Sequence, residues 1–385
     1  MTQKIVNTHV HVPPNFSAFA SPEDVVETAR AEGVRAIGIS NFYDQQVYGR
    51  FAELCRAAGI VPLFGLEFIT LVPDLEAAGI RVNDPANPGR MYVCGKGIDP
   101  FREKSPAAAA TAAEIREGND SRAAEMVRRL DVHLQAAGLG SRLTAEAIAA
   151  DVAARSCVPV EWVSLQERHI ARAVEEAVSA LAEGDRAAVL EKAYGAPAKA
   201  SLDDAVGMQG EVRSKLLKAG TAGFAPEVPL SFEAAYAYVL AMGGIPCYPT
   251  LADGVAPVCP FEEPPAALAA RLVERGIHLA ELIPIRNKTA VVDVYVEAFV
   301  AAGIEVVAGT EHNTADRIPF DPACTDGAMS GAARAAFWRG TCIVAAHQAR
   351  IAAGRPGYVD AAGRLAAPAE ELVTEGAAII GGVEE

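Results

Sequence analysis

The segment Lys4-Ile5-Val6-Asn7-Thr8-His9-Val10-His11-Val12 decides the predicted fold. Its β-branched residues and its alternating pattern predict a strand. Successive side chains on a strand point to opposite faces, so His9 and His11 point to the same side. They precede Pro13 and Pro14, near the strand end where a parallel α/β barrel carries its chemistry. We therefore interpret both as metal ligands, the alternative being two packed histidines with satisfied hydrogen bonds.

Six more segments with strand character alternate with helical patterns along the chain. The first strand–helix repeats follow one another with short connections, which predicts right-handed βαβ units with parallel strands. The α/β alternation favours a TIM-like barrel, and an open doubly wound sheet is the alternative. The seven predicted strands begin at residues 4, 34, 60, 91, 245, 277 and 304.

Residues 106–218 interrupt this rhythm with Ala, Glu and Arg at helical spacing. We expect two parts: residues 1–105 and 226–385 form the barrel, and residues 106–225 form an inserted helical region. This insertion would cover the barrel mouth. His133 and His169 lie on its helical patterns, and we interpret them as packing or surface residues.

Composition limits the classes of function. The 385 residues are 51% apolar and carry 34 basic against 49 acidic side chains, a net charge of −15. This balance argues against a broad nucleic-acid surface, although a local basic site for a small anion is compatible with it. Seven scattered cysteines without a Cys-x-x-Cys motif favour reduced thiols. With no signal-peptide pattern or long apolar run, we expect a cytoplasmic protein without a membrane or nucleic-acid partner.

Polar residues near the ends of several predicted strands form the candidate site. Barrel closure would gather them at one mouth, where imidazoles and carboxylates suit Zn²⁺, Mn²⁺ or Fe. Such an ion polarises a phosphoryl oxygen and acidifies a bound water. Besides the two histidines, the expected ligands are Glu67, Glu311 and His312. Glu67 lies in an apolar strand, where an unpaired carboxylate is costly.

A second set of residues is assigned to substrate binding. Arginine and lysine on loops above a metal suit phosphate or carboxylate groups, and solvated surface charge is the alternative. For Glu281, an ion pair with a neighbouring arginine is an equal alternative. The set consists of Asn41, Arg81, Arg90, Lys96, Tyr248 and Glu281.

Four motifs resemble the PHP (polymerase and histidinol phosphatase) family: Asn7-Thr8-His9-Val10-His11, residues 36–41 (AIGISN), Gly65-Leu66-Glu67 and Gly309-Thr310-Glu311-His312. The resemblance covers about residues 1–100 and 231–315. It implies a distorted (β/α)7 barrel and a metal-dependent phosphoesterase ancestry. His9, His11 and Glu67 match the family pattern directly, and the resemblance implies Glu311 or His312 as a further ligand from the last motif.

The chain departs from that pattern at three places. Asn41-Phe42 stands where the family has Asp-His, Tyr248-Pro249 where it has His-Pro, and Glu311-His312 where it has Asp-x-His. Asn41 offers a neutral amide oxygen in place of a charged ligand. We therefore expect one or two ions rather than the family's three.

The leading functional hypothesis is hydrolysis of a small phosphate ester or related anion. An amidohydrolase-like enzyme is the first alternative, although the predicted strands contain no lysine except Lys4 and Lys96 and the last strand ends in Glu rather than Asp. A catalytically reduced barrel that binds a regulatory ligand is the second. The sequence leaves the oligomeric state open.

Overall fold

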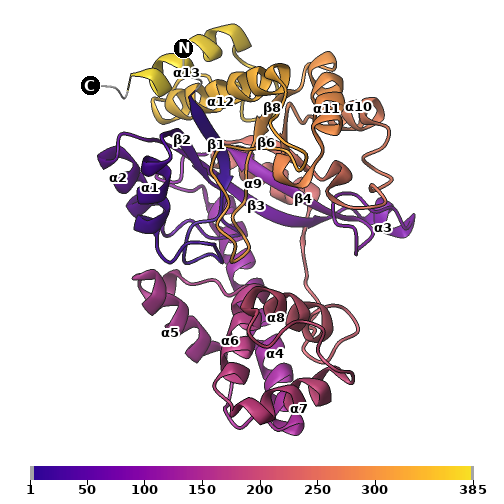
Figure 1. The fold of residues 1–385 in the computed structure, drawn as a ribbon. Coiled ribbons are helices and arrows are strands. Elements are labelled where there is room, and N and C mark those ends of the chain that lie inside the picture. Colours follow the sequence, from indigo (N-terminus) through magenta and orange to yellow (C-terminus); the bar gives the residue numbers. More distant parts are fainter. Residues whose placement is uncertain (1–3, 383–385) are drawn as a thin grey trace.

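A computed structural model describes residues 4–382, and Figure 1 shows a barrel-shaped sheet surrounded by helices. The sheet order is β1-β2-β3-β4-β6-β7-β8, and the short β5 pairs with β3. The strands are β1 (Ile5–Val10), β2 (Val34–Ile39), β3 (Val61–Leu71), β4 (Arg90–Lys96), β5 (Leu230–Ser231), β6 (Ile245–Thr250), β7 (Leu279–Leu282) and β8 (Glu305–Ala308). The predicted α/β barrel with seven main strands is confirmed.

Backbone hydrogen bonds bring the first and last strands of the sheet together. The Glu311 N–H donates to the His9 carbonyl at 2.8 Å, and the His11 N–H donates to the Glu311 carbonyl at 2.8 Å. An isolated parallel bridge joins Val10 to Glu311. The sheet is therefore nearly closed, and closure occurs at the His-x-His segment itself.

One strand runs against the expected direction. β4 is antiparallel to both β3 and β6, whereas the other main pairs are parallel. Between β3 and β4 lies only the five-residue helix α3 (Pro73–Ala77). Without a full crossover helix the chain turns back along β3 instead of returning to start a parallel strand. The parallel pairing expected from the strand–helix repeats therefore does not extend to this strand.

Helices cover the barrel in the remaining repeats. Ser21 caps the first helix by accepting a hydrogen bond from the Asp24 N–H at 3.3 Å, as its sequence predicts. The barrel helices are α1 (Pro22–Ala31), α2 (Tyr48–Ala57), α9 (Phe232–Ala241), α10 (Pro265–Glu274), α11 (Thr289–Ala301), α12 (Gly331–Ala352) and α13 (Ala369–Gly381), with 3-10 turns at Ala252–Gly254 and Pro284–Arg286. No helix within residues 4–382 has the length and apolar character needed to cross a bilayer.

Residues 106–217 contain helices and no strand of the sheet. They form a group on one side of the barrel (Figure 1) with an apolar core of their own, built from residues such as Leu130, Val174 and Leu190. Its helices are α4 (Pro106–Ala137), α5 (Ala145–Ser156), α6 (Glu167–Ser179), α7 (Glu183–Tyr194) and α8 (Ala205–Val212), with a 3-10 turn at Val160–Trp162 and a π-helical turn at Arg213–Leu217. We refer to this group as the helical region.

Candidate metal centre

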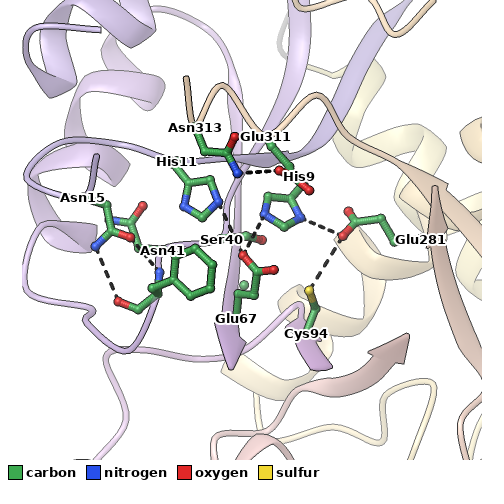
Figure 2. Close-up of polar contacts among 12 residues, drawn as sticks. His9, His11, Asn15, Ser40, Asn41, Glu67, Cys94, Glu281, Glu311 and Asn313 are labelled. Atoms are coloured by element: carbon green, nitrogen blue, oxygen red, sulfur yellow. Dashed lines mark hydrogen bonds and ion pairs between the residues drawn. The ribbon is translucent and has the colours of Figure 1, made fainter. Parts of the chain in front are cut away.

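Three buried side chains converge near the end of β1. His9 on β1 and His11, one residue after its end, both project toward Glu67 of β3 (Figure 2). The Nε2 atoms of His9 and His11 lie 3.6 Å and 3.4 Å from Oε2 of Glu67. One potential ligand atom from each residue lies within 4.8 Å of the other two. The period of the strand thus places both imidazoles on one carboxylate, as the sequence predicts.

The atoms at this point of convergence lack hydrogen-bond partners. Nε2 of His9, both ring nitrogens of His11 and Oε2 of Glu67 are buried without one. Unsatisfied buried polar atoms are costly and therefore rare. Two imidazole nitrogens and a carboxylate oxygen are donors that Zn²⁺, Mn²⁺ and Fe accept. The residues therefore fit a divalent metal ion.

A second set of buried groups lies behind His9. Nδ1 of His9 is 2.7 Å from Oε2 of Glu281 on β7, and the Cys94 thiol of β4 is 3.8 Å from the same oxygen. The Lys96 ammonium donates to Oε1 of Glu281 at 2.7 Å, to the Ser40 hydroxyl at 3.1 Å and to the Thr8 carbonyl at 3.0 Å. A metal-ligating histidine commonly donates its second N–H to a carboxylate, which fixes the ring and its tautomer.

Opposite charges dominate the electrostatics of this buried cluster. Burial opposes protonation of His9, but the Glu281 carboxylate outweighs it and raises the pKa of His9 to about 9. Burial likewise opposes ionisation of Glu281, but His9 and Lys96 hold the pKa of Glu281 well below its usual range. Burial also works against the anion of Glu67, but the adjacent imidazoles of His11 and His9 outweigh it and lower the pKa of Glu67. Both carboxylates are therefore anionic at neutral pH.

The direction of β4 determines where two predicted substrate-binding residues lie. Lys96, at the C-terminal end of β4, pairs with Gly65 in the middle of β3 and is buried inside the barrel. Arg90, at the other end of β4, lines a cavity outside the cluster, and its guanidinium lies 3.4 Å from the Glu227 carboxylate. Lys96 therefore contacts Glu281 rather than a substrate loop. Glu281 was expected to pair with an arginine if it formed an ion pair, but its partner is a lysine.

Glu311 lies at the same mouth without joining the cluster. Its carboxylate accepts hydrogen bonds from both terminal nitrogens of Arg286 and from the Asn313 amide, and Figure 2 shows Glu311 and Asn313 beside the two histidines. His312 turns away. Its Nδ1 lies 2.8 Å from the Thr310 hydroxyl, and its Nε2 lies 2.8 Å from the Ile318 carbonyl.

The remaining predicted site residues lie outside the cluster. The Asn41 amide bonds to the backbone of Val12, with Oδ1 accepting at 2.8 Å and Nδ2 donating at 2.9 Å. The Tyr248 hydroxyl donates to Glu262 at 3.0 Å, and Tyr248 packs in an apolar cluster. Arg81 does not line the cavity that contains Arg90. The structure therefore brings together His9, His11, Glu67, Lys96 and Glu281.

Three residues of the site were not identified from the sequence. Cys94 adjoins Glu281, Arg286 binds Glu311, and Asn313 bonds to Glu311. Asn313 had a usable signal, because it stands two residues after Glu311 and so occupies the third position of an Asp-x-His pattern. Cys94 and Arg286 had none, since their roles depend on strand pairing and on the turn after β7.

A cavity of about 540 Å³ lies between the barrel and the helical region. Its lining includes Phe42, whose ring stacks on His11 with centroids 5.0 Å apart, and Asn313, which donates to Glu311. This volume suits a small organic ligand. A space large enough for a substrate thus lies beside the ring that covers His11.

Comparison with known proteins shows the fold. No family model matches this sequence, and no curated protein matches it. A crystal structure from Bifidobacterium adolescentis, provisionally assigned as a metal-dependent phosphoesterase, aligns with a TM-score of 0.59 at 15% identity, over 88% of this chain and 97% of its own. An amidohydrolase from Chromobacterium violaceum, solved with bound sulfate and no metal, aligns with a TM-score of 0.53 at 18% identity, over 83% and 93%. At these identities the likeness shows a shared barrel fold.

Proposed function

We propose that this protein is a metal-dependent hydrolase of the PHP type that acts on a small phosphate ester or a related anionic metabolite. The observation that carries the proposal is the convergence of His9 Nε2, His11 Nε2 and Glu67 Oε2, all buried without hydrogen-bond partners. The phosphoesterase and amidohydrolase folds of the two structural neighbours, one of them with bound sulfate, support this class of function. The four PHP-like sequence motifs favour the phosphoesterase.

The residues of this site have different roles in the proposed function. His9, His11 and Glu67 would hold one ion. Glu281 orients His9, and Lys96 holds Glu281 in its anionic form. Zinc, manganese or iron, when bound, supplies a Lewis acid for a phosphoryl oxygen and for water. Phe42 covers one face of His11 and shields it from bulk water.

Elemental analysis and a turnover assay test this proposal. Protein purified without chelator should contain one or two transition-metal ions per chain, and it should hydrolyse an aryl phosphate faster with added Mn²⁺. His9→Ala and Glu67→Ala should each lose metal and turnover while keeping the wild-type circular dichroism spectrum. His133→Ala, a half-buried histidine of the helical region, is the matched control. Wild-type metal content in both site variants would refute the ligand assignment.

Two other functions remain as alternatives to phosphate-ester hydrolysis. An amidohydrolase reaction is favoured by the Chromobacterium neighbour, and turnover of amides or lactones in place of aryl phosphate would identify it. A ligand-binding barrel is favoured by Asn41, Phe42 and Tyr248, which stand where the PHP pattern has ligands. Stoichiometric metal without turnover of any of these substrates would indicate that role.

We also propose that residues 106–225 act as an inserted module, and that the protein works in the cytoplasm without nucleic-acid or membrane partners. The separate apolar core of the helical region supports the first part. Limited proteolysis between its helices should leave the barrel segments associated. Dissociation of the barrel after such cleavage would show that the helical region completes it.

A further inference from the structure

The cavity between the barrel and the helical region is lined by more basic than acidic side chains. Five cations face three acids in a chain whose net charge is −15. Acidic residues predominate in the chain as a whole, so an excess of positive charge in one cavity is a local feature. The charged lining residues are Arg90, Arg122, Arg168, Arg213 and Lys218, with Asp84, Glu167 and Glu227.

Three of the five cations are neutralised by close ion pairs within the cavity wall. Arg122 and Lys218 contact Glu167 at 2.8 Å and 2.6 Å, and Arg90 lies 3.4 Å from Glu227. These pairs account for two of the three acids. The positive charges of Arg168 and Arg213 are not neutralised by these close pairs.

Arg168 and Arg213 lack such compensation. Within residues 4–382, the side chain of Arg168 makes no hydrogen bond or ion pair, and its guanidinium carbon lies 5.9 Å from the centre of the Phe16 ring. Nε of Arg213 is buried without a hydrogen-bond partner, and Nη2 of Arg213 is 3.7 Å from the shared Glu167. Arg168 is the second residue of α6, and Arg213 is the first residue of the π-helical turn after α8. Both are therefore held on regular elements of the helical region.

The electrostatic environment of Arg168 connects the helical region to the metal centre. Burial and the neighbouring Arg213 lower the pKa of Arg168 to about 10, while the Glu311 carboxylate opposes that change. Arg168 thus experiences the charge of Arg213 within the helical region and the charges of Glu311 and Arg286 at the barrel mouth. Two arginines that repel each other in a partly buried cavity are stabilised by an anion placed between them.

We propose that Arg168 and Arg213 form a second anion site in this cavity, which binds a phosphate group of the substrate apart from the metal centre. The substrate would then be a small molecule with two anionic groups, one at the metal ligands and one at these arginines. The 540 Å³ cavity is far larger than a single phosphate ion requires, and its aromatic lining suits the body of such a molecule. The assignment of one anionic group of the substrate to the metal ligands rests on the proposed function. The anion site at the two arginines does not depend on that function.

Calorimetric titration of inorganic phosphate into chelator-treated protein tests the arginine site by itself. Arg168→Gln and Arg213→Gln should each weaken binding about tenfold, and Arg168→Lys should retain part of the affinity. Arg128→Gln is the matched control, because Arg128 is 65% exposed on α4 and pairs with Glu125. Equal affinity in all variants, or no binding to the wild type, would overturn the proposal.

Thermal unfolding separates ligand binding from a structural role. Replacing either of two neighbouring cations relieves repulsion, so neither glutamine variant should melt below the wild type. A lower midpoint together with unchanged phosphate affinity would show that the arginines serve the fold. The proposed hydrolase function can be refuted independently of this site. Phosphate binding that depends on the two arginines, without turnover that depends on Mn²⁺, would support the anion site and refute the hydrolase function.

A two-ended ligand tests the spacing between the two sites. With Mn²⁺ added, fructose 1,6-bisphosphate should bind more tightly than fructose 6-phosphate. That advantage should disappear in the Arg168→Gln, Arg213→Gln double variant and persist in Arg128→Gln. Equal binding of the two sugar phosphates to the wild type would refute a two-ended substrate.

Discussion

Nδ1 of His9 and Oε2 of Glu281 lie 2.7 Å apart in the barrel interior, although 272 residues separate them in the sequence. The contact turns Nε2 of His9 toward Glu67, where this nitrogen has no hydrogen-bond partner. Lys96 fixes the other carboxylate oxygen of Glu281. The orientation of a candidate ligand on β1 is thus set from β7 and β4.

Glu281→Gln should weaken metal binding without unfolding the barrel. The amide keeps the volume of the side chain but loses the charge that orients His9 and pairs with Lys96, and loss of such a partner typically lowers metal affinity about 10- to 100-fold. Competition against a chromophoric chelator measures this affinity. Glu305→Gln is the control, because Glu305 pairs with Arg339 outside the site. Unchanged affinity in Glu281→Gln would mean that His9 is oriented by other contacts.

Asn41→Asp should destabilise the protein and add no metal ligand. The Asn41 amide both accepts from and donates to the backbone of Val12, whereas an aspartate would place a carboxylate oxygen against the Val12 carbonyl. Loss of one buried donor costs about 1–3 kcal/mol of unfolding free energy. Urea unfolding and metal content measure the two effects. A rise in bound metal would instead place residue 41 among the ligands.

The sequence predicted the strand positions well because hydrophobic alternation is a local property. Residues 4–12 predicted β1, and the same-face placement of His9 and His11 followed from strand geometry alone. Glu67 was recognisable because a carboxylate is unusual within so apolar a strand. Lys96 illustrates the limit: its place beside Glu281 depends on the reversed direction of β4, which no local pattern specifies.

Other differences also arise from tertiary contacts. His312 was expected at the metal, but Thr310 and Ile318 engage both of its ring nitrogens. The chain after α12 forms α13, which packs closely on α12. There Gly376 allows close packing, because a Cβ at this position would come within 1.9 Å of the Cys342 carbonyl oxygen.

Gly309→Ala should disrupt both barrel closure and the metal site. A Cβ at Gly309 would lie 2.3 Å from Cβ of His9, on the backbone that joins β8 to β1. Overpacking at a buried position costs about 1–3 kcal/mol. We expect a lower urea midpoint and weaker metal binding together. Gly303→Ala is a comparison with open space around the new methyl group, although its positive φ of 76° adds some strain. Equal metal affinity in Gly309→Ala and the wild type would show that β1 tolerates the displacement.

His347 should make the folded state sensitive to mild acid. Nε2 of its buried ring lies 2.7 Å from the Gly243 carbonyl oxygen, and Nδ1 accepts a hydrogen bond from the Tyr358 N–H at 2.8 Å. The neutral ring, with its proton on Nε2, satisfies both contacts. Burial lowers the pKa of His347 from 6.5 to about 4, against the opposing effect of the Gly243 carbonyl. Between these values the unfolded chain binds more protons at this residue, so its contribution to stability is complete above pH 6.5 and declines as the pH falls toward 4.

The size of this effect follows from the pKa difference. A shift of this magnitude corresponds to a total loss on the order of 3 kcal/mol, at about 1.4 kcal/mol per pH unit. His347→Gln removes the titrating group, so the difference in unfolding free energy between wild type and variant should shrink between pH 7 and pH 4.5. Above pH 7 the same difference should stay constant, which provides an internal control. A difference that is independent of pH over the whole range would show that the His347 ring can be protonated without loss of its contacts.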